Sequence, residues 1–554
     1  MKNPFHENSH PVVIQAQQSL EQGRISRREF LRVAALVGMS YGGAQLLEAL
    51  SPQTALASSI KRGGTMRIGY RVHGLDHPAR DAHGADTIIH HVIPNLAWMR
   101  KDNIAQPWLL EGWEASDDLT KWTLNLKQGL VWTNGDEFTA EDVQYTFGEW
   151  LNKDTASSVL GLFNGFLTPD GVEVVDNYKV VLHLEKPLLA VPESLTHYPA
   201  MVLHRNFSGD MLDGNLQGLG PWVIDEYIVD ERARLVPSGN SNFMGEDGQA
   251  LPYLDTLEYL DLGEDQAPYQ AALKAGELHM IPRWEAPEQY SAYLKDPRFT
   301  VDVASTGRTA VARMRVDQDP WKDNRVRTAL KICQERQKIL DGAILGQGIL
   351  GHDTHVSPVH PEWVDIPLPE YDPERSKKLL AEAGYPDGLE VTLAVNTGRP
   401  ETVPYAEVLA ESAKAGGWNI VLDAMSGQAH GAKWNIWNFS ITTWGHRSPA
   451  VMMLPLAYTK DSEGNPVPWN ESYWVDDEFS EILVEAQGTF DLEARKELVH
   501  KLALIQQERG SIGISYWRNL FRVTNRAFHN VSSHPNEYSY LDTIWYDPNE
   551  DPFA

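Results

Sequence analysis

Leu109–Phe147 has the sequence LLEGWEASDDLTKWTLNLKQGLVWTNGDEFTAEDVQYTF, and no other stretch says as much about the fold. Alternation of apolar and polar residues over Trp122–Leu126 predicts a β-strand, and the Asn-Gly pair that follows suits a turn. The segment TAEDVQYTFGEWL predicts a helix, because Thr139 can cap it and Asp142 stands where a capping box has its acid. Four further positions suit core or turn roles: Trp113, Trp122, Asp136 and Phe138. The stretch therefore predicts a packed unit and no ligand site.

Short strands and helices alternate on both sides of this stretch, which is typical of an α/β fold. Strands are predicted at Gly64–Tyr70 and Leu389–Val395. A helix is predicted over Tyr371–Tyr385, where Asp372 can cap the first turn. A longer amphipathic helix is predicted over Asp491–Gln507. The chain has no short repeat, so we expect interleaved domains.

The N-terminal region carries an export pattern. SRREFLR at Ser26–Arg32 contains the twin pair Arg27 and Arg28, and a modestly apolar run diluted by glycines follows over Val33–Leu50. This order of a basic pair and an apolar run is typical of a Tat-type signal. The alternative is an ordinary amphipathic helix after a basic turn.

The small residues Ala55 and Ala57 flank Leu56 in the pattern of a signal peptidase site. Residues 1–57 are therefore predicted to be a Tat signal peptide that is removed, so that the mature chain begins near Ser58. We expect the protein to work outside the bacterial cytoplasm.

The composition limits the possible functions. The chain has 554 residues, a net charge of −28 and 42% hydrophobic residues, enough for two or three domains with cores of their own. The acidic balance argues against nucleic acid as a partner. After the signal, no run of 18 apolar residues occurs. Cys333 is the only cysteine, which excludes an intramolecular disulfide and cysteine-ligated clusters, and its helical context predicts burial.

Six segments in order resemble one family, the extracellular solute-binding proteins of the dipeptide, oligopeptide and nickel ABC importers (solute-binding protein family 5). The segments are Leu109–Phe147, GLGPWVIDEY at Gly218–Tyr227, LPYLDTLEY at Leu251–Tyr259, LKAGELHM at Leu273–Met280, DPWKDNRVRTALKICQERQKIL at Asp319–Leu340 and YDPERSKKLLAEAGYP at Tyr371–Pro386. Trp222 replaces the tyrosine of the family's Gly-x-Gly-Pro-Tyr turn. The resemblance extends over essentially the whole mature chain.

The resemblance implies an α/β fold of the periplasmic-binding-protein type II class, with two interleaved lobes and an extra subdomain (cluster C-like). The expected boundaries are 58–100 for the first part of lobe I, 101–214 for the extra subdomain, 215–312 for the second part of lobe I, 313–512 for lobe II and 513–554 for the C-terminal return to lobe I.

The resemblance also implies a function. It implies a periplasmic substrate-binding protein of an ABC importer in a Gram-negative bacterium, which captures a small polar solute (peptide-like, opine-like or sugar-like) by lobe closure. The expected partners are this ligand, the membrane subunits of an ABC permease and, during export, the Tat translocase. A monomer without enzymatic activity, cofactor or nucleic-acid partner is expected.

The loop Ile441–Leu454 departs from the family's peptide-binding members. Those members have a Trp and then an Asp that holds the ammonium group of the peptide. This chain keeps Trp444, but Gly445, His446 and Arg447 follow, and the loop has no acid. A guanidinium in a closed cleft suits a carboxylate, a phosphate or a hydroxyl-rich ligand and would repel an ammonium group. The alternative for Arg447 is a solvated surface arginine.

Other candidate ligand residues are Arg283, Trp284 and Arg308, the first two where the family has a cleft loop. Arg308, like Arg313 and Arg315, lies on a predicted strand that leads to the crossing between the lobes, and each of these arginines has a salt-bridge role as its alternative. The predicted ligand-binding set is Trp444, His446, Arg447, Trp284, Arg283 and Arg308. Trp434 and Trp437 are weaker candidates for stacking on a ligand.

Two alternative functions stay open. The first is a Tat-exported periplasmic cofactor enzyme, although the sequence has no recognisable cofactor motif. The second is a receptor for a nickel chelate that uses one or two histidines from a larger group: His90, His91, His352, His355 and His360. Their spacing matches no defined metal site built from protein ligands alone, so no metal ligand is assigned.

Overall fold

The computed structural model describes residues 60–80, 86–101, 103–209, 211, 216–284, 291–461, 463–535 and 540–554. The predicted export residues Arg27, Arg28, Ala55 and Ala57 lie outside the described residues.

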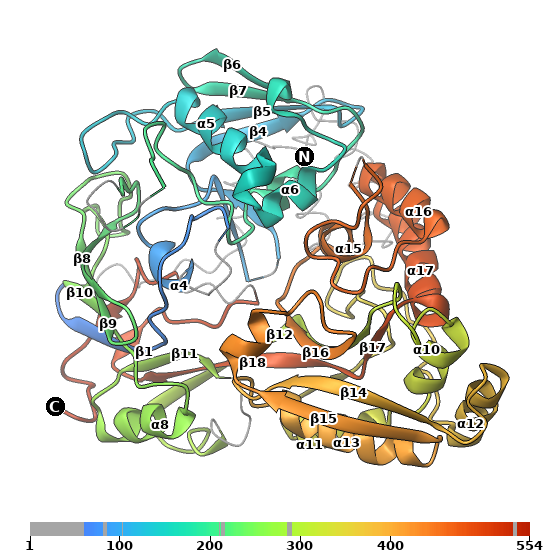
Figure 1. Ribbon diagram of the computed structural model, residues 1–554. Helices are drawn as coiled ribbons and strands as arrows, with labels where there is room; N and C mark the ends of the chain where they lie inside the picture. Colours follow the sequence, from blue (N-terminus) through green and yellow to red (C-terminus); the bar gives the residue numbers. More distant parts are fainter. Residues whose placement is uncertain are drawn as a thin grey trace, which may run out of the picture.

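One mixed sheet runs through both lobes (Figure 1). Its strands, in spatial order, are β15 (Trp418–Met425), β14 (Leu389–Asn396), β16 (Phe439–Trp444), β12 (Phe299–Met314), β18 (Tyr516–Asn525), β11 (Met280–Trp284), β1 (Thr65–Gly69), β10 (Thr256–Leu260), β9 (Arg232–Pro237) and β8 (Trp222–Ile228). Two short strands, β13 (Gly348–Leu350) and β17 (Ile512–Ile514), pair with β18 and β12. The predicted strands at Gly64–Tyr70 and Leu389–Val395 are confirmed as β1 and β14.

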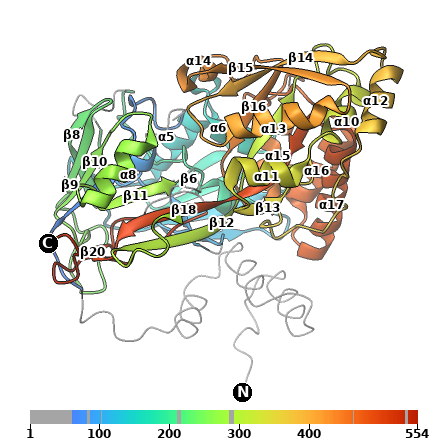
Figure 2. The same ribbon diagram turned by 90° about the horizontal axis from the view of Figure 1, so that it is seen from below.

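Two long strands connect the lobes and lie side by side in Figure 2. The first part of β12, from Phe299 to Ser305, pairs with β18, and its second part, from Thr309 to Met314, pairs with β16. The register between β12 and β18 is irregular between Ser305 and Arg308. The pairing partner of β12 therefore changes from β18 to β16 at this irregularity, and we call residues 305–309 the crossing.

Each lobe has its own hydrophobic core. In lobe I, β1 and β8–β11 bury Met66, Trp222 and Tyr259, with α8 (Gln266–Ala275) packed nearby. In lobe II, helices cover one face of β12 and β14–β16 around buried Cys333 and Tyr405, which confirms the burial predicted for the cysteine. These helices are α10 (Asn324–Lys331), α11 (Arg336–Ile344), α12 (Pro373–Glu382) and α13 (Thr402–Lys414). Asp372 caps α12 through the Arg375 backbone N–H, as predicted.

The extra subdomain is a separate four-stranded sheet covered by helices. Its strands lie in the order β4 (Leu110–Ala115), β5 (Lys121–Leu126), β7 (Lys179–His183) and β6 (Val172–Asp176), and its helices include α5 (Ala140–Leu151) and α6 (Ser158–Phe163). Trp113, Trp122 and Phe138 are buried in its core, as predicted. Alternation along β5 puts its apolar side chains into this core and its polar ones outward.

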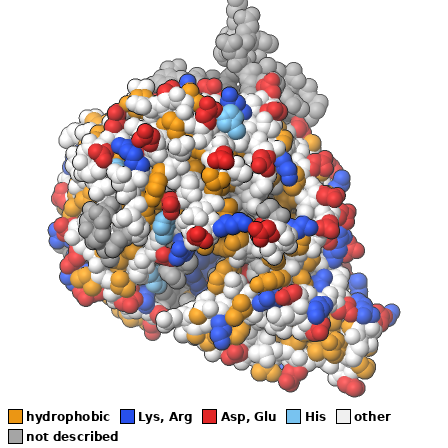
Figure 3. All heavy atoms as spheres, turned by 45° about the horizontal axis from the view of Figure 1, so that its top comes forward, with side chains coloured by type: hydrophobic (Ala, Val, Ile, Leu, Met, Phe, Trp, Pro, Cys, Tyr) orange, Lys and Arg blue, Asp and Glu red, His pale blue; other side chains and the backbone are white. Residues whose placement is uncertain are grey.

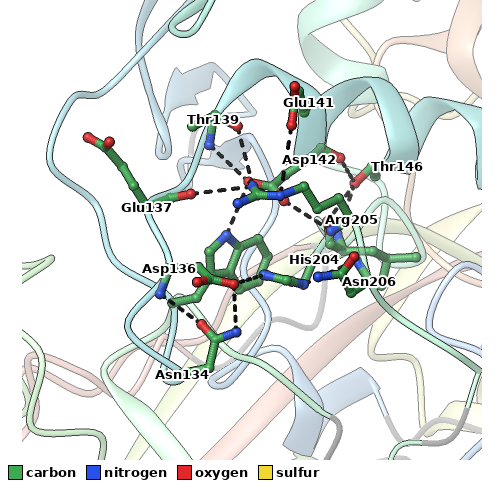
Figure 4. Close-up of polar contacts among 12 residues, drawn as sticks. Asn134, Asp136, Glu137, Thr139, Glu141, Asp142, Thr146, His204, Arg205 and Asn206 are labelled. Atoms are coloured by element: carbon green, nitrogen blue, oxygen red, sulfur yellow. Dashed lines mark hydrogen bonds and ion pairs between the residues drawn. The ribbon is translucent and has the colours of Figure 1, made fainter.

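The predicted capping box of α5 is present and belongs to a larger polar cluster (Figure 4). The fully buried carboxylate of Asp142 accepts hydrogen bonds from the Thr139 N–H at 2.9 Å and from Trp132 Nε1 at 3.2 Å. It also accepts from the backbone N–H and Nη1 of Arg205, both at 3.0 Å. These donors to the carboxylate are residues of the protein itself, so the cluster has a structural role.

The extra subdomain and lobe II are packed together. Helices α15 (Ala450–Tyr458), α16 (Asp477–Gly488) and α17 (Leu492–Arg509) share one hydrophobic core with α6, and α6 lies beside α15 in Figure 1. The Leu189 N–H donates to the Gln487 carbonyl at 2.8 Å. The extra subdomain and lobe II are therefore in direct contact in this structure, and we call this contact the closure. None of the helices that the structure describes is long and apolar enough to cross a membrane.

Candidate ligand-binding site

The candidate loop lies where three parts of the molecule meet. It follows Trp444 at the end of β16 and leads into α15 through a cis peptide bond at Ser448-Pro449. His446 Nδ1 accepts from the Gly307 N–H of the crossing at 2.7 Å, so its proton lies on Nε2, 2.9 Å from Asn103 Oδ1. His446, predicted as a ligand residue, therefore connects lobe II to the crossing and to the turn that contains Asn103.

Arg447 is buried, with 7% of its surface exposed, so the alternative of a solvated surface arginine is wrong. The central carbon of its guanidinium group lies 5.3 Å from the ring centroid of Trp469, 5.7 Å from that of Trp444 and 5.9 Å from that of Tyr198. These distances allow cation–π attraction. Arg447 Nη1 also donates to the Gly445 carbonyl at 3.2 Å. Since Tyr198 belongs to the extra subdomain, aromatic rings from both sides of the closure surround this cation.

We call Trp434, Trp444, Trp469 and Tyr198 the aromatic wall. Trp469 packs edge-on against Trp444 at 5.8 Å and Trp434 at 6.4 Å, and it lies 6.4 Å from Tyr198. Trp437, the other weak candidate, stacks instead on His430 at 6.1 Å. Sequence reasoning missed Trp469 and Tyr198, because both lie outside regular elements in segments without a distinguishing motif.

A carboxylate lies beside Trp444 although the loop has no acid. Glu471, 27 residues further along the chain, accepts hydrogen bonds from Trp444 Nε1 at 2.7 Å and from Thr442 Oγ1 at 2.6 Å. Its other oxygen lies 3.4 Å from Arg313 Nε. Burial raises the pKa of Glu471, and the charge of Arg313 opposes that shift. The sequence identified the loop's lack of an acid and could not identify this neighbour.

Two histidines near Arg447 are held neutral. Burial lowers the pKa values of His197 and His355 well below the ordinary value, and the charge of Arg447 adds to both shifts. His197 Nε2 lies 2.8 Å from Ser158 Oγ, and His355 Nδ1 lies 2.7 Å from Tyr458 Oη. Near neutral pH these two imidazoles therefore contribute hydrogen-bonding groups and no charge. The face in Figure 3 is hollowed, and both basic and acidic side chains reach the surface around that hollow.

The remaining predicted residues lie elsewhere along the crossing and the sheet. Buried Arg308 stands opposite Arg518 in the register of β12 and β18, and Arg518 Nη1 pairs with Glu401 at 2.5 Å. Arg283 and Trp284 form the end of β11, which pairs with β18. Two other arginines form the salt bridges given as their alternative role. Arg313, on β12, pairs with Glu471, and Arg315, just after β12, pairs with Asp317.

No three His, Cys, Asp or Glu side chains among the described residues gather as a metal ion would require. His355 and His360 instead lie in the loop beneath the site, where His355 packs edge-on against Trp444 at 5.3 Å and the ring of His360 lies 6.4 Å from that of His446. A chelate held by one or two histidines stays a prediction.

Comparison with known proteins identifies relatives of the chain. The family model of the bacterial extracellular solute-binding proteins, family 5, matches residues 105–465, more than half of the chain. The di/tripeptide-binding protein 1 of Pseudomonas aeruginosa (strain UCBPP-PA14) is 25% identical over 473 residues, which cover 77% of this chain and 83% of that protein. The glutathione-binding protein GsiB of Salmonella typhi is 27% identical over 307 residues, 54% of this chain and 57% of its own.

Solved structures share the fold. DppA from Helicobacter pylori in complex with the peptide STSA has a TM-score of 0.78 at 17% identity and covers 89% of this chain and 100% of its own. AgaA from A. tumefaciens R10 in complex with agropinic acid has a TM-score of 0.77 at 18% identity. The match covers 87% of this chain and 99% of AgaA. These likenesses confirm the predicted periplasmic-binding-protein architecture. The match of the family model across most of both lobes and the subdomain makes this chain a member of the bacterial extracellular solute-binding proteins, family 5.

Proposed function

We propose that this protein is the periplasmic substrate-binding protein of an ABC importer and that its ligand is a small solute with a carboxylate, a phosphate or many hydroxyl groups. The observation that carries the ligand class is the buried Arg447 with aromatic rings on both sides of the closure. The protein acts as a monomer without enzymatic activity and delivers its ligand to the membrane subunits of the permease.

The charges around the site support an anionic ligand. Arg447 is a permanent cation, whereas His197 and His355 stay neutral. Glu471, the carboxylate beside Trp444, is already engaged by Arg313 and two hydrogen bonds. The guanidinium of Arg447 would repel an ammonium group, whereas a carboxylate or phosphate could form charge-assisted hydrogen bonds with it. Trp444 would provide the stacking surface, Arg308 would support the site from the crossing, and His446 would support it from the loop after β16.

The relatives suggest suitable probes. Peptides, glutathione, agropinic acid and a nickel–histidine complex are named with members of this fold. Agropinic acid and the dipeptide Met-Leu make a useful contrast, because the first is an acid and the second carries a free ammonium group besides its carboxylate. We expect the acid to bind more tightly than the dipeptide.

The test begins with the native ligand. Protein purified from its own periplasm is denatured, and the released small molecules are identified by mass spectrometry. The identified solute, agropinic acid and Met-Leu are then titrated by calorimetry into wild type, Arg447→Ala and Arg447→Lys. Arg447→Ala should weaken binding of the anionic ligand by about 1.5–3 kcal/mol, or roughly ten- to hundredfold. Unchanged affinity in Arg447→Ala would move the anchor to Arg308 or Arg283.

Turnover and metal content separate the receptor from its alternatives. The receptor should leave its ligand chemically unchanged after prolonged incubation, and the purified mature protein should be colourless and free of metal. Conversion of the bound solute would support the exported enzyme instead. Preferential binding of Ni(L-His) over agropinic acid would support the nickel-chelate receptor.

We further propose export through the Tat translocase, on the basis of the Arg27-Arg28 pair and the small residues Ala55 and Ala57. Changing both arginines to lysine should leave full-length precursor in the cytoplasm, detected by fractionation and immunoblotting. Mature protein in the periplasm at normal levels would point to the general secretory route.

A further inference from the structure

Arg313 organises three segments of lobe II from a fully buried position. It lies on β12, and its Nη1 donates to the carbonyls of Trp437 at 2.6 Å and Glu471 at 3.0 Å. Its Nη2 donates to the carbonyl of Trp434. One guanidinium group therefore joins the central strand to the segment that carries Trp434 and to the segment that carries Trp469.

Glu471 connects this guanidinium group to the ring of Trp444. Thr442 and Trp444 are two residues apart on β16, so their side chains leave the same face of the strand. The Oε1 atom of Glu471 accepts from both, while Oε2 faces Arg313 Nε at 3.4 Å. Val311, two residues before Arg313, belongs to the core shared with α15–α17, so this face points toward the closure.

The energetics argue that this carboxylate serves the protein and not the ligand. A buried carboxylate is costly unless an opposite charge and hydrogen bonds compensate it. Glu471 is 5% exposed and has both kinds of compensation. A ligand ammonium group would have to compete with Arg313, the Trp444 indole and the Thr442 hydroxyl for the same two oxygens.

We propose that Glu471, paired with Arg313, is a positioning residue that fixes the orientation of Trp444 and thereby the shape of the aromatic wall. The pair acts on ligand recognition only through Trp444 and its neighbours. The consequence for affinity rests on the proposed function, whereas the orientation of Trp444 does not, so the two can fail separately.

The first experiment needs no ligand. The mature protein is labelled with ¹⁵N-tryptophan, and the indole N–H signal of Trp444 is assigned as the one lost in Trp444→Phe. Glu471→Met should speed solvent exchange of this N–H at least about tenfold, because its acceptor is gone. Glu471→Gln should shift the signal and keep it protected, since the amide oxygen can still accept.

The matched control is Glu401→Gln. Glu401 is also a buried glutamate paired with an arginine, but its partner is Arg518 on β18, opposite Arg308. This variant should leave the Trp444 signal in place. An unchanged Trp444 signal in both Glu471 variants would overturn the proposal. If Glu471→Met does not fold, an unchanged signal in Glu471→Gln alone would overturn it.

The second experiment uses Met-Leu as a probe, followed by calorimetry. If wild type binds Met-Leu and Glu471→Gln abolishes that binding while the Trp444 signal stays unmoved, Glu471 is an ammonium contact and the positioning role is wrong. If Glu471→Gln changes Met-Leu binding no more than Glu401→Gln does, and moves the indole signal, the positioning role is supported. Failure of agropinic acid or any other anion to bind would contradict only the proposed ligand class.

Discussion

A single residue sets the charge of the candidate site. The loop after Trp444 has no acid over Gly445–Pro449, and Arg447 is the cation in it. The surrounding rings of Trp444, Trp469 and Tyr198 exclude water, and a low-dielectric environment strengthens any interaction with a charged ligand group. The sign of the charge at this position should therefore dominate ligand choice.

Arg447→Asp tests that conclusion directly. We expect the variant to lose affinity for agropinic acid and to gain affinity for Met-Leu by at least about tenfold, because a carboxylate can pair with an ammonium group. Calorimetry with both probes measures the exchange of preference. Arg315→Ala, which removes an arginine paired with Asp317, is the control and should leave both affinities unchanged. If the dipeptide gains nothing in Arg447→Asp, the charge at this position does not select the ligand.

Helix α5 illustrates how the strongest sequence pattern serves stability and not recognition. Its capping acid, Asp142, accepts hydrogen bonds from the helix start, from Trp132 and from Arg205, and all the partners drawn in Figure 4 are residues of the protein itself. The helix in turn buries Phe147 and Trp150 in the core shared with α6 and α15. Loss of the acid should therefore weaken the fold and leave the chemistry of the ligand site alone.

Asp142→Ala should lower the free energy of unfolding by about 3 kcal/mol, because it leaves the guanidinium of Arg205 and several N–H groups without their buried acceptor. Urea denaturation followed by circular dichroism measures the change. Asp136→Ala is the matched control, since Asp136 is half-exposed and its loss should cost far less. A ligand affinity lowered more than a few-fold in folded Asp142→Ala would show that the cluster also reaches the site.

The closure joins parts that are far apart in the sequence. His446 connects the crossing to Asn103, and α15 shares a core with α6 of the extra subdomain. Several buried histidines elsewhere depend on staying neutral within this packing. Burial lowers the pKa of His90 to about 3, and the pKa values of His279, His430 and His534 to about 4.

These depressed pKa values make stability depend on pH. The unfolded chain binds protons on these histidines below about pH 6.5, whereas the folded protein does so only near pH 4. Their contribution is therefore complete above pH 6.5 and is lost progressively as the pH falls toward 4. We therefore expect the midpoint of urea denaturation to be lower at pH 5 than at pH 7.

His430→Gln should reduce this pH dependence. The glutamine can keep a hydrogen bond to Ser440, which lies 2.8 Å from His430 Nε2, but it takes up no proton. His183→Gln is the control, because His183 is half-exposed and pairs with Glu173 on the surface. Equal stability of wild type at pH 7 and pH 5 would show that these histidines do not control acid unfolding.

Much of the architecture follows from the sequence alone. The alternation of β5, the capping box of α5, the punctuation of α12 and the burial of Cys333 are local patterns, and each is confirmed. The family motifs predicted the two-lobe fold, because their residues occupy turns and core positions that such a fold requires. The prediction that Trp444 and Arg447 contact the ligand has the same origin, because both lie in a loop that the family resemblance singles out.

The composition of the site depended on tertiary structure. Three residues near Trp444 and Arg447 come from segments without a motif of their own. Tyr198 contacts Arg447 across the closure, and Trp469 and Glu471 belong to an irregular segment. The sequence could not decide whether Arg447 is solvated or buried, because that depends on which distant residues pack against it. The same holds for the contacts of His446. Sequence patterns report the neighbours within an element, whereas burial and charge compensation arise from contacts between elements, and those exist only once the lobes are packed together.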